Sequence, residues 1–335
     1  MIKSFGITKN GQEAHLFTLE NEKTIVTLCE HGARMVSFIN KETGTDILQG
    51  FDDVSGFEKM KSMGASVGRV CNRITKGTFT LNGKEYHTEI NEYDNTRHSG
   101  SATFANKMFA YDVQGNKVTF SLESPDGEGG FPGNLHAEIV YELKDDGLYY
   151  SFCGASDQDT PLSVTNHAYF NLNGPADNSV LDHELQVCAS AFMGIDPHEL
   201  ITGEVIKTEG TPFDFREFKR IGKDIGEENE QLKNGIGYDH HFVIDGKGMR
   251  KHCELRNDVL DLEVWSDLPG VQVYTSNTNT GEFPGKQGGT FPARSSICLE
   301  TQYVPDALNH PEVEQPILKA GGTLKHTTIY KLHKR

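Results

Sequence analysis

Short runs in which apolar and polar residues alternate recur along most of the chain. Examples are residues 23–29, 117–122, 147–152 and 259–265. Gly, Asn, Asp and Pro separate these runs, as is usual where turns join strands. Because neighbouring side chains of a strand point to opposite faces, the alternation predicts β-strands with one buried face.

A specific turn signal lies within these strand-like runs. The runs 78–81 and 85–88 flank the pair Asn82 and Gly83. Asn-Gly tolerates the positive φ angles of a tight two-residue turn. We therefore predict a β-hairpin here.

Helical patterns are scarce. Residues 214–233 are the best candidate, but Gly222 and Gly226 favour short helices or turns over one long helix. Residues 52–61 could hold another short helical turn. Strands and helices do not alternate regularly, which disfavours a parallel α/β fold. We predict an all-β fold, a large antiparallel β-sandwich with a few short helices, as a single domain over residues 1–335.

The net charge of the chain disfavours some classes of binding partner. With 32 Lys and Arg against 48 Asp and Glu, the net charge is −16 at pH 7. Phosphate backbones and anionic lipid would repel such a protein, so we expect neither nucleic acid nor a membrane as partner. The N-terminus lacks the apolar core of a secretory signal, and no apolar run is long enough to span a bilayer. These features predict a cytoplasmic protein.

The cysteines and histidines do not predict a metal or a cofactor. Six cysteines stand at 29, 71, 153, 188, 253 and 298 without a Cys-x-x-Cys pair, which predicts buried free thiols. His240 and His241 are neighbours on a predicted strand and face opposite sides, so we do not expect them to chelate one ion. Residues 285–290 lack the ending of a phosphate-binding loop. We expect no metal, no nucleotide and no other cofactor.

One histidine stands in the aromatic, β-favouring segment 165–172, Thr-Asn-His-Ala-Tyr-Phe-Asn-Leu. We interpret this segment as a strand in which His167 can hold or deliver a proton near neutral pH, beside a surface suited to a sugar ring. A satisfied core histidine is the alternative. Glu300 ends an apolar run, which suggests a carboxylate at a cleft mouth or paired with a cation. The alternative is a glutamate in solvent on an edge strand.

Other polar residues carry the donors and acceptors that a sugar requires. Arg73 offers a fixed fork of donors, and Gln272 offers a donor and an acceptor in mid-strand. Asn72 precedes Arg73 on an extended segment, so one of the two can point into a pocket. His98 lies in a polar loop, where functional side chains are common. Asp239 can accept hydrogen bonds from a polyol. A surface arginine, a solvated loop histidine and a turn-stabilising aspartate are the alternatives.

Taken together, these segments resemble the galactose mutarotases, or aldose 1-epimerases, along nearly the whole chain. Motifs of that family occur in order at 68–77, 98–100, 126–134, 165–172, 202–204, 213–216, 237–240, 269–274 and 300–307. The resemblance implies a galactose mutarotase-like supersandwich. It also implies an isomerase that interconverts the α and β anomers of free aldohexoses such as galactose and glucose, without a cofactor.

The resemblance also assigns roles to residues. It makes Glu300 the general base and His167 the general acid. The sugar-contacting positions are Asn72, Arg73, His98, Asp239 and Gln272. The chain departs from the family at Arg97, where leucine is usual, at Ser99, where glycine is usual, and in the loop 91–95. These departures flank the expected pocket, so we expect them to affect sugar preference more than the chemistry.

The reaction explains why these residue types are needed. Anomers interconvert when the ring opens to the aldehyde and closes on the other face. A base takes the proton of the hydroxyl on carbon 1 while an acid protonates the ring oxygen. With ordinary pKa values of about 4.3 and 6.5, glutamate is ionised at pH 7 and histidine can be protonated. Each positioned proton transfer contributes roughly 10²–10⁴ in rate.

Three other functions stay open. A hexose-6-phosphate 1-epimerase needs a basic cluster around the phosphate, and only Arg73 and Arg97 stand near the expected pocket. A non-catalytic sugar-binding module would not need both His167 and Glu300. A two-carboxylate glycosidase lacks an obvious second acid. The expected partner is a small aldose, and the chain is expected to be a monomer or a homodimer.

Overall fold

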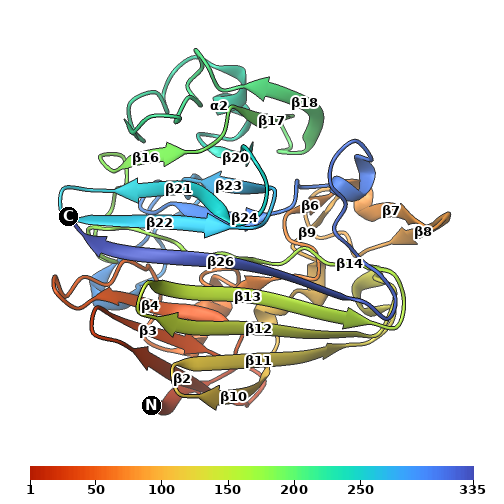
Figure 1. Ribbon diagram of the computed structural model, residues 1–335, viewed down its shortest axis with the longest axis horizontal. Coiled ribbons are helices and arrows are strands. Elements are labelled where there is room, and N and C mark those ends of the chain that lie inside the picture. The colour runs from red at the N-terminus through yellow and green to blue at the C-terminus, as the bar shows by residue number, and fades with distance from the viewer.

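Antiparallel strands dominate the computed structural model, which describes all 335 residues (Figure 1). The strands form three larger sheets of nine, five and four strands and four two-stranded pairs. Helices are few and short. The predicted all-β class with large antiparallel sheets is confirmed.

The nine-stranded sheet runs across the front of the molecule in Figure 1. In order across the sheet, its strands are β10 (Ala110–Gln114), β11 (Lys117–Ser124), β12 (Leu135–Lys144), β13 (Gly147–Ser156), β26 (Thr323–Lys334), β22 (Leu260–Ser266), β21 (Arg250–Arg256), β16 (Glu184–Val187) and β19 (Lys219–Arg220). Along β12 and β13, buried residues alternate with more exposed ones. This period of two places one face of the sheet on the core.

The five-stranded sheet provides the floor of the site described below. In order, its strands are β18 (Ile201–Lys207), β17 (Ala191–Ile195), β20 (Asp239–Val243), β23 (Gly270–Tyr274) and β24 (Cys298–Gln302). All neighbours in it are antiparallel. The strands β23 and β24 are buried along their whole length. Both faces of these two strands are therefore covered.

Both sheets contribute to the main hydrophobic core, a cluster of 53 buried residues. Ile139 and Phe152 face each other across β12 and β13 and belong to it. Val271, Val273 and Leu299 of β23 and β24 belong to it as well. Because strand residues alternate between faces, the residues between these apolar ones lie on the other side of the five-stranded sheet.

A four-stranded sheet forms the N-terminal part of the chain. Its strands, in order, are β1 (Ile2–Ile7), β2 (Glu13–Glu20), β3 (Thr24–Cys29) and β4 (Arg34–Asn40). The ammonium group of Lys286, from the loop 285–290, is buried against this sheet. It donates to the carbonyl of Val36 (2.5 Å) and to the Asp46 carboxylate (2.6 Å). Lys286 thus ties a distant loop to the N-terminal sheet.

The remaining elements are short. The two-stranded pairs are β5 (Ser66–Val67) with β15 (Thr165–Asn166), β6 (Arg73–Ile74) with β9 (Thr96–Arg97), β7 (Thr78–Leu81) with β8 (Lys84–His87), and β14 (Thr160–Pro161) with β25 (Ile317–Leu318). The helices are α1 (Val54–Lys59) and α2 (Glu230–Asn234), and the 3-10 turns are η1 (Thr75–Gly77), η2 (Gly100–Ala102), η3 (Phe104–Asn106), η4 (Glu128–Gly130), η5 (Lys286–Gly288) and η6 (Ala307–Asn309). Neither α-helix is long and apolar enough to cross a membrane.

The predicted hairpin is confirmed as β7 and β8. Asn82 and Gly83 connect the strands with φ angles of 52° and 77°. A tight two-residue hairpin turn requires such left-handed values, and Asn and Gly adopt them readily.

Two local predictions need correction. The segment 165–172 is a regular strand only over β15, because Phe170 then makes single bridges to Leu48 and Ile297 instead of continuing one ladder. The prediction of short helices or turns within 214–233 is confirmed, because only the start of α2 is helical there. All six cysteines are free, but Cys153 and Cys188 are half-buried.

Candidate active site

The floor of the site is the face of β20, β23 and β24 that lies opposite the main core. The strand register aligns Asp239 with Tyr274 and places Gln272 directly across from Glu300. Val273, between the two β23 residues of this face, belongs to the core. The alternation of strand residues therefore brings an amide and two carboxylates together on one surface.

His167 reaches this floor from the segment that follows β15. Its backbone N–H donates to the carbonyl of Ala65 (2.9 Å), and its carbonyl accepts from the N–H of Gly64 (2.8 Å). The His167 Nε2 atom lies 3.6 Å from Glu300 Oε1, and the side chains are only 2% and 3% exposed. Two residues that are remote in sequence thus meet in one buried place. This position corrects the expectation that Glu300 lies at a cleft mouth or in solvent.

Aromatic rings hold the imidazole of His167 in place. Tyr169 stacks on it with ring centroids 5.0 Å apart and an interplanar angle of 13°. His98 and Tyr274 meet it edge-on, at 5.5 and 6.3 Å. His167 is buried among polar and aromatic groups, and its Nδ1 atom has no hydrogen-bond partner. It is therefore not a satisfied core histidine.

Two hydrogen bonds join His98 and Asn72, and one of them uses the His98 ring. The N–H of Asn72 donates to Nδ1 of His98 (3.0 Å), and the N–H of His98 donates to the carbonyl of Asn72 (2.8 Å). Since Nδ1 accepts, the neutral ring carries its proton on Nε2 and keeps a donor for another partner. Burial also lowers the pKa of His98 well below its ordinary value, and the positive charges of Arg97 and Arg73 add to the shift. His98 is thus a neutral donor, not a solvated loop residue.

Gln272 and Glu300 each leave an acceptor free. Gln272 Nε2 donates to Asp239 Oδ1 (2.7 Å), whereas Gln272 Oε1 and Glu300 Oε2 are buried without a partner. Buried polar atoms are almost always hydrogen-bonded in folded proteins. Two orphaned acceptors beside one another therefore indicate a place where a ligand supplies donors, such as hydroxyl groups.

A chain of ion pairs crosses the entrance. Arg73 Nε bonds to Glu92 Oε2 (2.6 Å), and Arg73 Nη2 bonds to the carboxylate of Glu199. Arg97 Nη1 bonds to the other oxygen of Glu92 (2.9 Å). The loop 91–95 and Arg97, two features that depart from the family pattern, are therefore joined in one network with Arg73.

The site consists of a small inner cavity and a wide outer basin. The inner cavity has a free volume of about 10 Å³ and is lined by six of the predicted site residues together with Arg97 and Tyr274. The six are Asn72, Arg73, His98, His167, Asp239 and Glu300. The outer basin, about 650 Å³, shares Arg73, Arg97, Asp239 and Tyr274 with it. Gln272, the seventh predicted residue, is bonded to Asp239.

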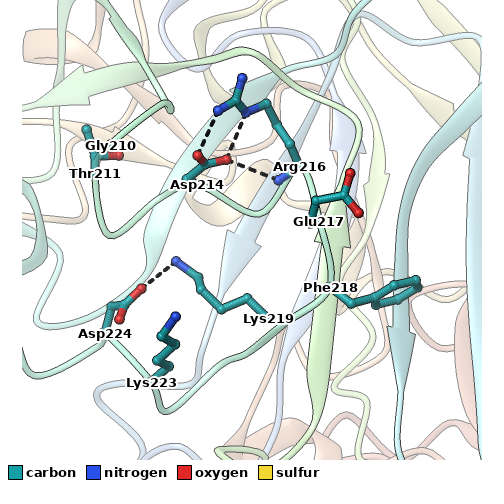
Figure 2. A pocket seen from close by; sticks show the side chains of 9 residues that line it. All are labelled: Gly210, Thr211, Asp214, Arg216, Glu217, Phe218, Lys219, Lys223 and Asp224. Carbon is teal, nitrogen blue, oxygen red and sulfur yellow. Dashed lines mark hydrogen bonds and ion pairs between the residues drawn. The ribbon is translucent and has the colours of Figure 1, made fainter.

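Another surface hollow, of about 690 Å³, is shown in Figure 2. Its charged side chains are largely paired with each other, as in Lys219 with Asp224 (2.7 Å) and Arg216 with Asp214 (2.8 Å). It shares no lining residue with the cavity of His167 and Glu300. We assign no function to this hollow.

Burial changes the proton affinities of the central pair. It raises the pKa of Glu300 to about 8, and the nearby Asp239 carboxylate adds to this shift, while Arg97 and Arg73 oppose it. Burial lowers the pKa of His167 to about 3, and the charge of Arg97 adds to that shift. Near neutral pH the pair therefore holds one proton, and this proton is on Glu300. The expectation of an ionised glutamate beside a protonated histidine needs this correction, because it used the pKa values of solvated side chains.

The sequence interpretation did not include Tyr274, Glu92 or Glu199 in the site. Tyr274 is two residues after Gln272 on the same strand, so its position on the same face follows from strand alternation. Glu92 and Glu199 have no comparable signal, because their role depends on where two loops meet.

The predicted opposite orientation of the adjacent histidines is observed in part: His240 packs against the rings of Phe192 and Phe213.

The fold and the site together define a β-sandwich protein with an acid–base pair in a polar pocket, and comparison with known proteins gives the family. The family model described as Aldose 1-epimerase matches residues 15–331. Galactose mutarotase from Bos taurus is 38% identical over 322 residues, covering 94% of this chain and 93% of the bovine protein. Aldose 1-epimerase from Escherichia coli is 31% identical over 338 residues, covering 97% of each chain.

Solved structures agree with this result. The aldose epimerase homologue from C. elegans superposes with a TM-score of 0.88 at 25% identity, covering 96% of this chain and 99% of that one. The chain therefore belongs to the aldose 1-epimerase family. It is an isomerase that interconverts the α and β anomers of sugars.

Proposed function

We propose that the protein interconverts the anomers of free galactose and glucose, with Glu300 as general base and His167 as general acid. The observation that carries the proposal is the 3.6 Å separation of His167 Nε2 and Glu300 Oε1 in a buried polar pocket. The names of the mammalian relatives, galactose mutarotases, support galactose as a substrate. The proposed partner of this site is therefore a free, unphosphorylated aldose.

The spacing of the two groups suits a single hemiacetal. The hydroxyl oxygen on carbon 1 and the ring oxygen are bonded to the same carbon, so they lie closer together than two hydrogen-bonded atoms. Two catalytic atoms can then each hydrogen-bond one of these oxygens while lying only slightly farther apart than a hydrogen bond. The distance between His167 Nε2 and Glu300 Oε1 meets this condition.

The proton count of the pair also suits the reaction. Ring opening removes one proton from the hydroxyl and delivers one to the ring oxygen, so the total number of protons is unchanged. A pair that holds one proton between the pKa of His167, about 3, and that of Glu300, about 8, can perform both transfers. The hydroxyl protons of a bound sugar would favour the ionised carboxylate, because hydrogen bonds to a charged form stabilise it.

The other polar residues position the sugar. His98 offers the proton on Nε2, and the orphaned acceptor Gln272 Oε1 suits a hydroxyl. Asp239, Asn72 and Arg73 line the same cavity. After the ring opens, rotation about the bond between carbons 1 and 2 exposes the other face of the aldehyde. His167 then takes back the proton and Glu300 returns its own, which closes the ring as the other anomer.

Alternative substrates fit less well. A 6-phosphorylated hexose needs free cationic groups, but Arg73 and Arg97 are already bonded to Glu92 and Glu199. Asp239 is a second acid near Glu300, which sequence alone did not reveal, yet family membership gives an isomerase and not a glycosidase. The net charge of −16 disfavours nucleic acid and anionic membranes as partners. We also propose a cytoplasmic protein that is a monomer or a homodimer.

Polarimetry of freshly dissolved α-D-galactose and α-D-glucose tests the proposal. We expect the wild type to accelerate relaxation of both sugars, and Glu300→Gln and His167→Asn each to lower kcat/KM by roughly 10²–10⁴. Glu230→Gln changes an exposed carboxylate of the outer basin and serves as the matched control. Equal rates for the wild type and Glu300→Gln would rule out Glu300 as the base. Faster relaxation of the 6-phosphorylated hexoses would reverse the choice of substrate.

A further inference from the structure

Cys298 places a thiol beside the proposed catalytic pair. It lies two residues before Glu300 on β24, so both side chains point to the same face of the sheet. Its register partner across β23 is Tyr274, which lines the inner cavity. Cys298 is fully buried, forms no disulfide and makes no side-chain hydrogen bond. The proposed acid–base reaction gives this thiol no role.

Three potential metal ligands converge there. One donor atom from each of His167, Cys298 and Glu300 can be chosen so that all lie within 4.8 Å of one another. His167 Nε2 and Glu300 Oε1 are 3.6 Å apart. Metal–ligand bonds of 2.0–2.3 Å at tetrahedral angles put two ligand atoms roughly 3.4–3.6 Å apart. The pair already has this spacing, and a small movement of the thiol would complete three corners of a tetrahedron.

The donor set indicates which cation fits. Imidazole nitrogen, thiolate sulfur and carboxylate oxygen are the three kinds of ligand that Zn²⁺ takes in proteins. Mg²⁺ and Ca²⁺ prefer oxygen ligands alone, so a site with sulfur and nitrogen discriminates against them. The orphaned Glu300 Oε2 atom shows that the carboxylate has bonding capacity left.

We propose that His167, Cys298 and Glu300 form a zinc site inside the catalytic pocket, and that Zn²⁺ bound there inhibits the enzyme by excluding the sugar. The proposal rests on the proposed roles of His167 and Glu300. A metal ion uses the lone pairs of the imidazole and the carboxylate, which are the groups that exchange protons with the hemiacetal. It would also lie between the two groups that must contact the hemiacetal. Zinc and sugar therefore cannot bind together.

Inhibition kinetics test the competition. Mutarotation is measured by polarimetry at several sugar concentrations, with free Zn²⁺ set by a metal buffer, and with Mg²⁺ at equal concentration as the ionic control. We expect zinc to raise the apparent KM and to leave kcat unchanged, Mg²⁺ to have no effect, and a chelator to restore the rate. Zinc inhibition that lowers kcat at saturating sugar would overturn the proposal.

Cysteine variants locate the site. Cys298→Ser keeps the size of the side chain, and we expect it to retain metal-free activity while zinc inhibits it at least tenfold more weakly. Cys153→Ser removes a half-buried thiol on β13 and should be inhibited like the wild type. Equal zinc sensitivity of Cys298→Ser and the wild type would contradict the site, as would resistance of Cys153→Ser.

A readout without catalysis separates the metal site from the proposed reaction. Cd²⁺ binds thiolates as zinc does and gives an ultraviolet charge-transfer band. We expect this band in the wild type and in Cys153→Ser, its loss in Cys298→Ser, and its displacement by added Zn²⁺. A band that persists in Cys298→Ser would refute the site. If the metal-free wild type did not mutarotate sugars but showed the band, the proposed reaction would fail while the metal site stood.

Discussion

Burial reverses the ordinary charges of the glutamate and histidine that we propose as catalysts. A carboxyl removed from water holds its proton more tightly, and an imidazole removed from water holds its proton less tightly. The pKa of Glu300 rises to about 8 and that of His167 falls to about 3, so one proton is shared over a wide pH range. The proposed reaction needs one proton on the pair, and burial in the polar pocket supplies that state.

The dependence of kcat/KM on pH should report this shared proton. As the pH rises through about 8, the free pair loses its last proton and no acid remains to protonate the ring oxygen. We expect kcat/KM to be level near neutral pH and to fall about tenfold per pH unit above this point. Polarimetry across pH 6–10, with the uncatalysed relaxation subtracted at each pH, measures the profile. A rate that keeps rising above pH 8 would contradict the assignment.

Arg97 provides a directional control for that profile. Its positive charge lowers the pKa of Glu300. Arg97→Leu, which restores the residue usual in the family, should therefore move the alkaline fall to higher pH. If the midpoint of the alkaline fall in kcat/KM did not move, a group other than Glu300 would be responsible for it.

At the scale of elements, strand alternation explains why part of the site could be predicted. The alternating runs gave β3, β11, β13 and β22 nearly at their observed bounds, and the Asn-Gly pair gave the β7–β8 hairpin. The segment 165–172 failed as a single strand because Phe170 bridges two different neighbours. Local periodicity predicts which residues alternate, but it does not specify which segments become partners.

The loop 91–95 and the strand pair β6–β9 form the entrance together. Arg73, at the start of β6, is held by Glu92 from the loop and by Glu199. Arg97 on β9 bonds to the other oxygen of Glu92. A charge-assisted hydrogen bond is stronger and more directional than a neutral one, so Glu92 orients the guanidinium of Arg73 before the sugar arrives.

Removing the charge of Glu92 should weaken sugar binding more than chemistry. In Glu92→Gln, Arg73 loses its oriented partner, and we expect KM to rise about tenfold, equal to about 1.4 kcal/mol, with little change in kcat. Initial rates over a range of galactose concentrations measure both constants. Glu230→Gln lies in the same basin without an ion pair to Arg73 and should behave like the wild type. An unchanged KM in Glu92→Gln would mean that Arg73 does not need this partner.

For the whole molecule, the site exists only because distant segments pack together. Its residues come from β6, β9, the segment after β15, β20, β23 and β24. The motif resemblance predicted seven site residues, since each motif is local. The 3.6 Å contact of His167 with Glu300 and the network of Arg73 are properties of the packed sheets. No local pattern encodes them, and for the same reason ordinary pKa values misjudged the pair.

Concentrating polar groups in the interior also lowers stability, and Glu300 allows this cost to be measured. The folded chain keeps the Glu300 proton up to about pH 8, whereas the unfolded chain releases it near the ordinary value of 4.5. Between these two values the unfolded state binds fewer protons, so the wild type should lose stability as pH rises, by at most about 5 kcal/mol in total. The stability that the folded state gains by holding the Glu300 proton is fully present below about pH 4.5 and is lost as the pH approaches 8.

Glu300→Gln has no such proton, so its free energy of unfolding should exceed that of the wild type by a margin that grows from pH 5 to pH 8. Urea denaturation of both proteins at several pH values, with chelator present, measures the margin. Glu230→Gln, an exposed control, should give a constant difference from the wild type. A constant difference for Glu300→Gln as well would mean that Glu300 is ionised in the folded protein across this range, and the one-proton pair would have to be abandoned. A growing margin would show that the fold gives up stability to keep this carboxyl inside the pocket, where it can exchange a proton with a sugar.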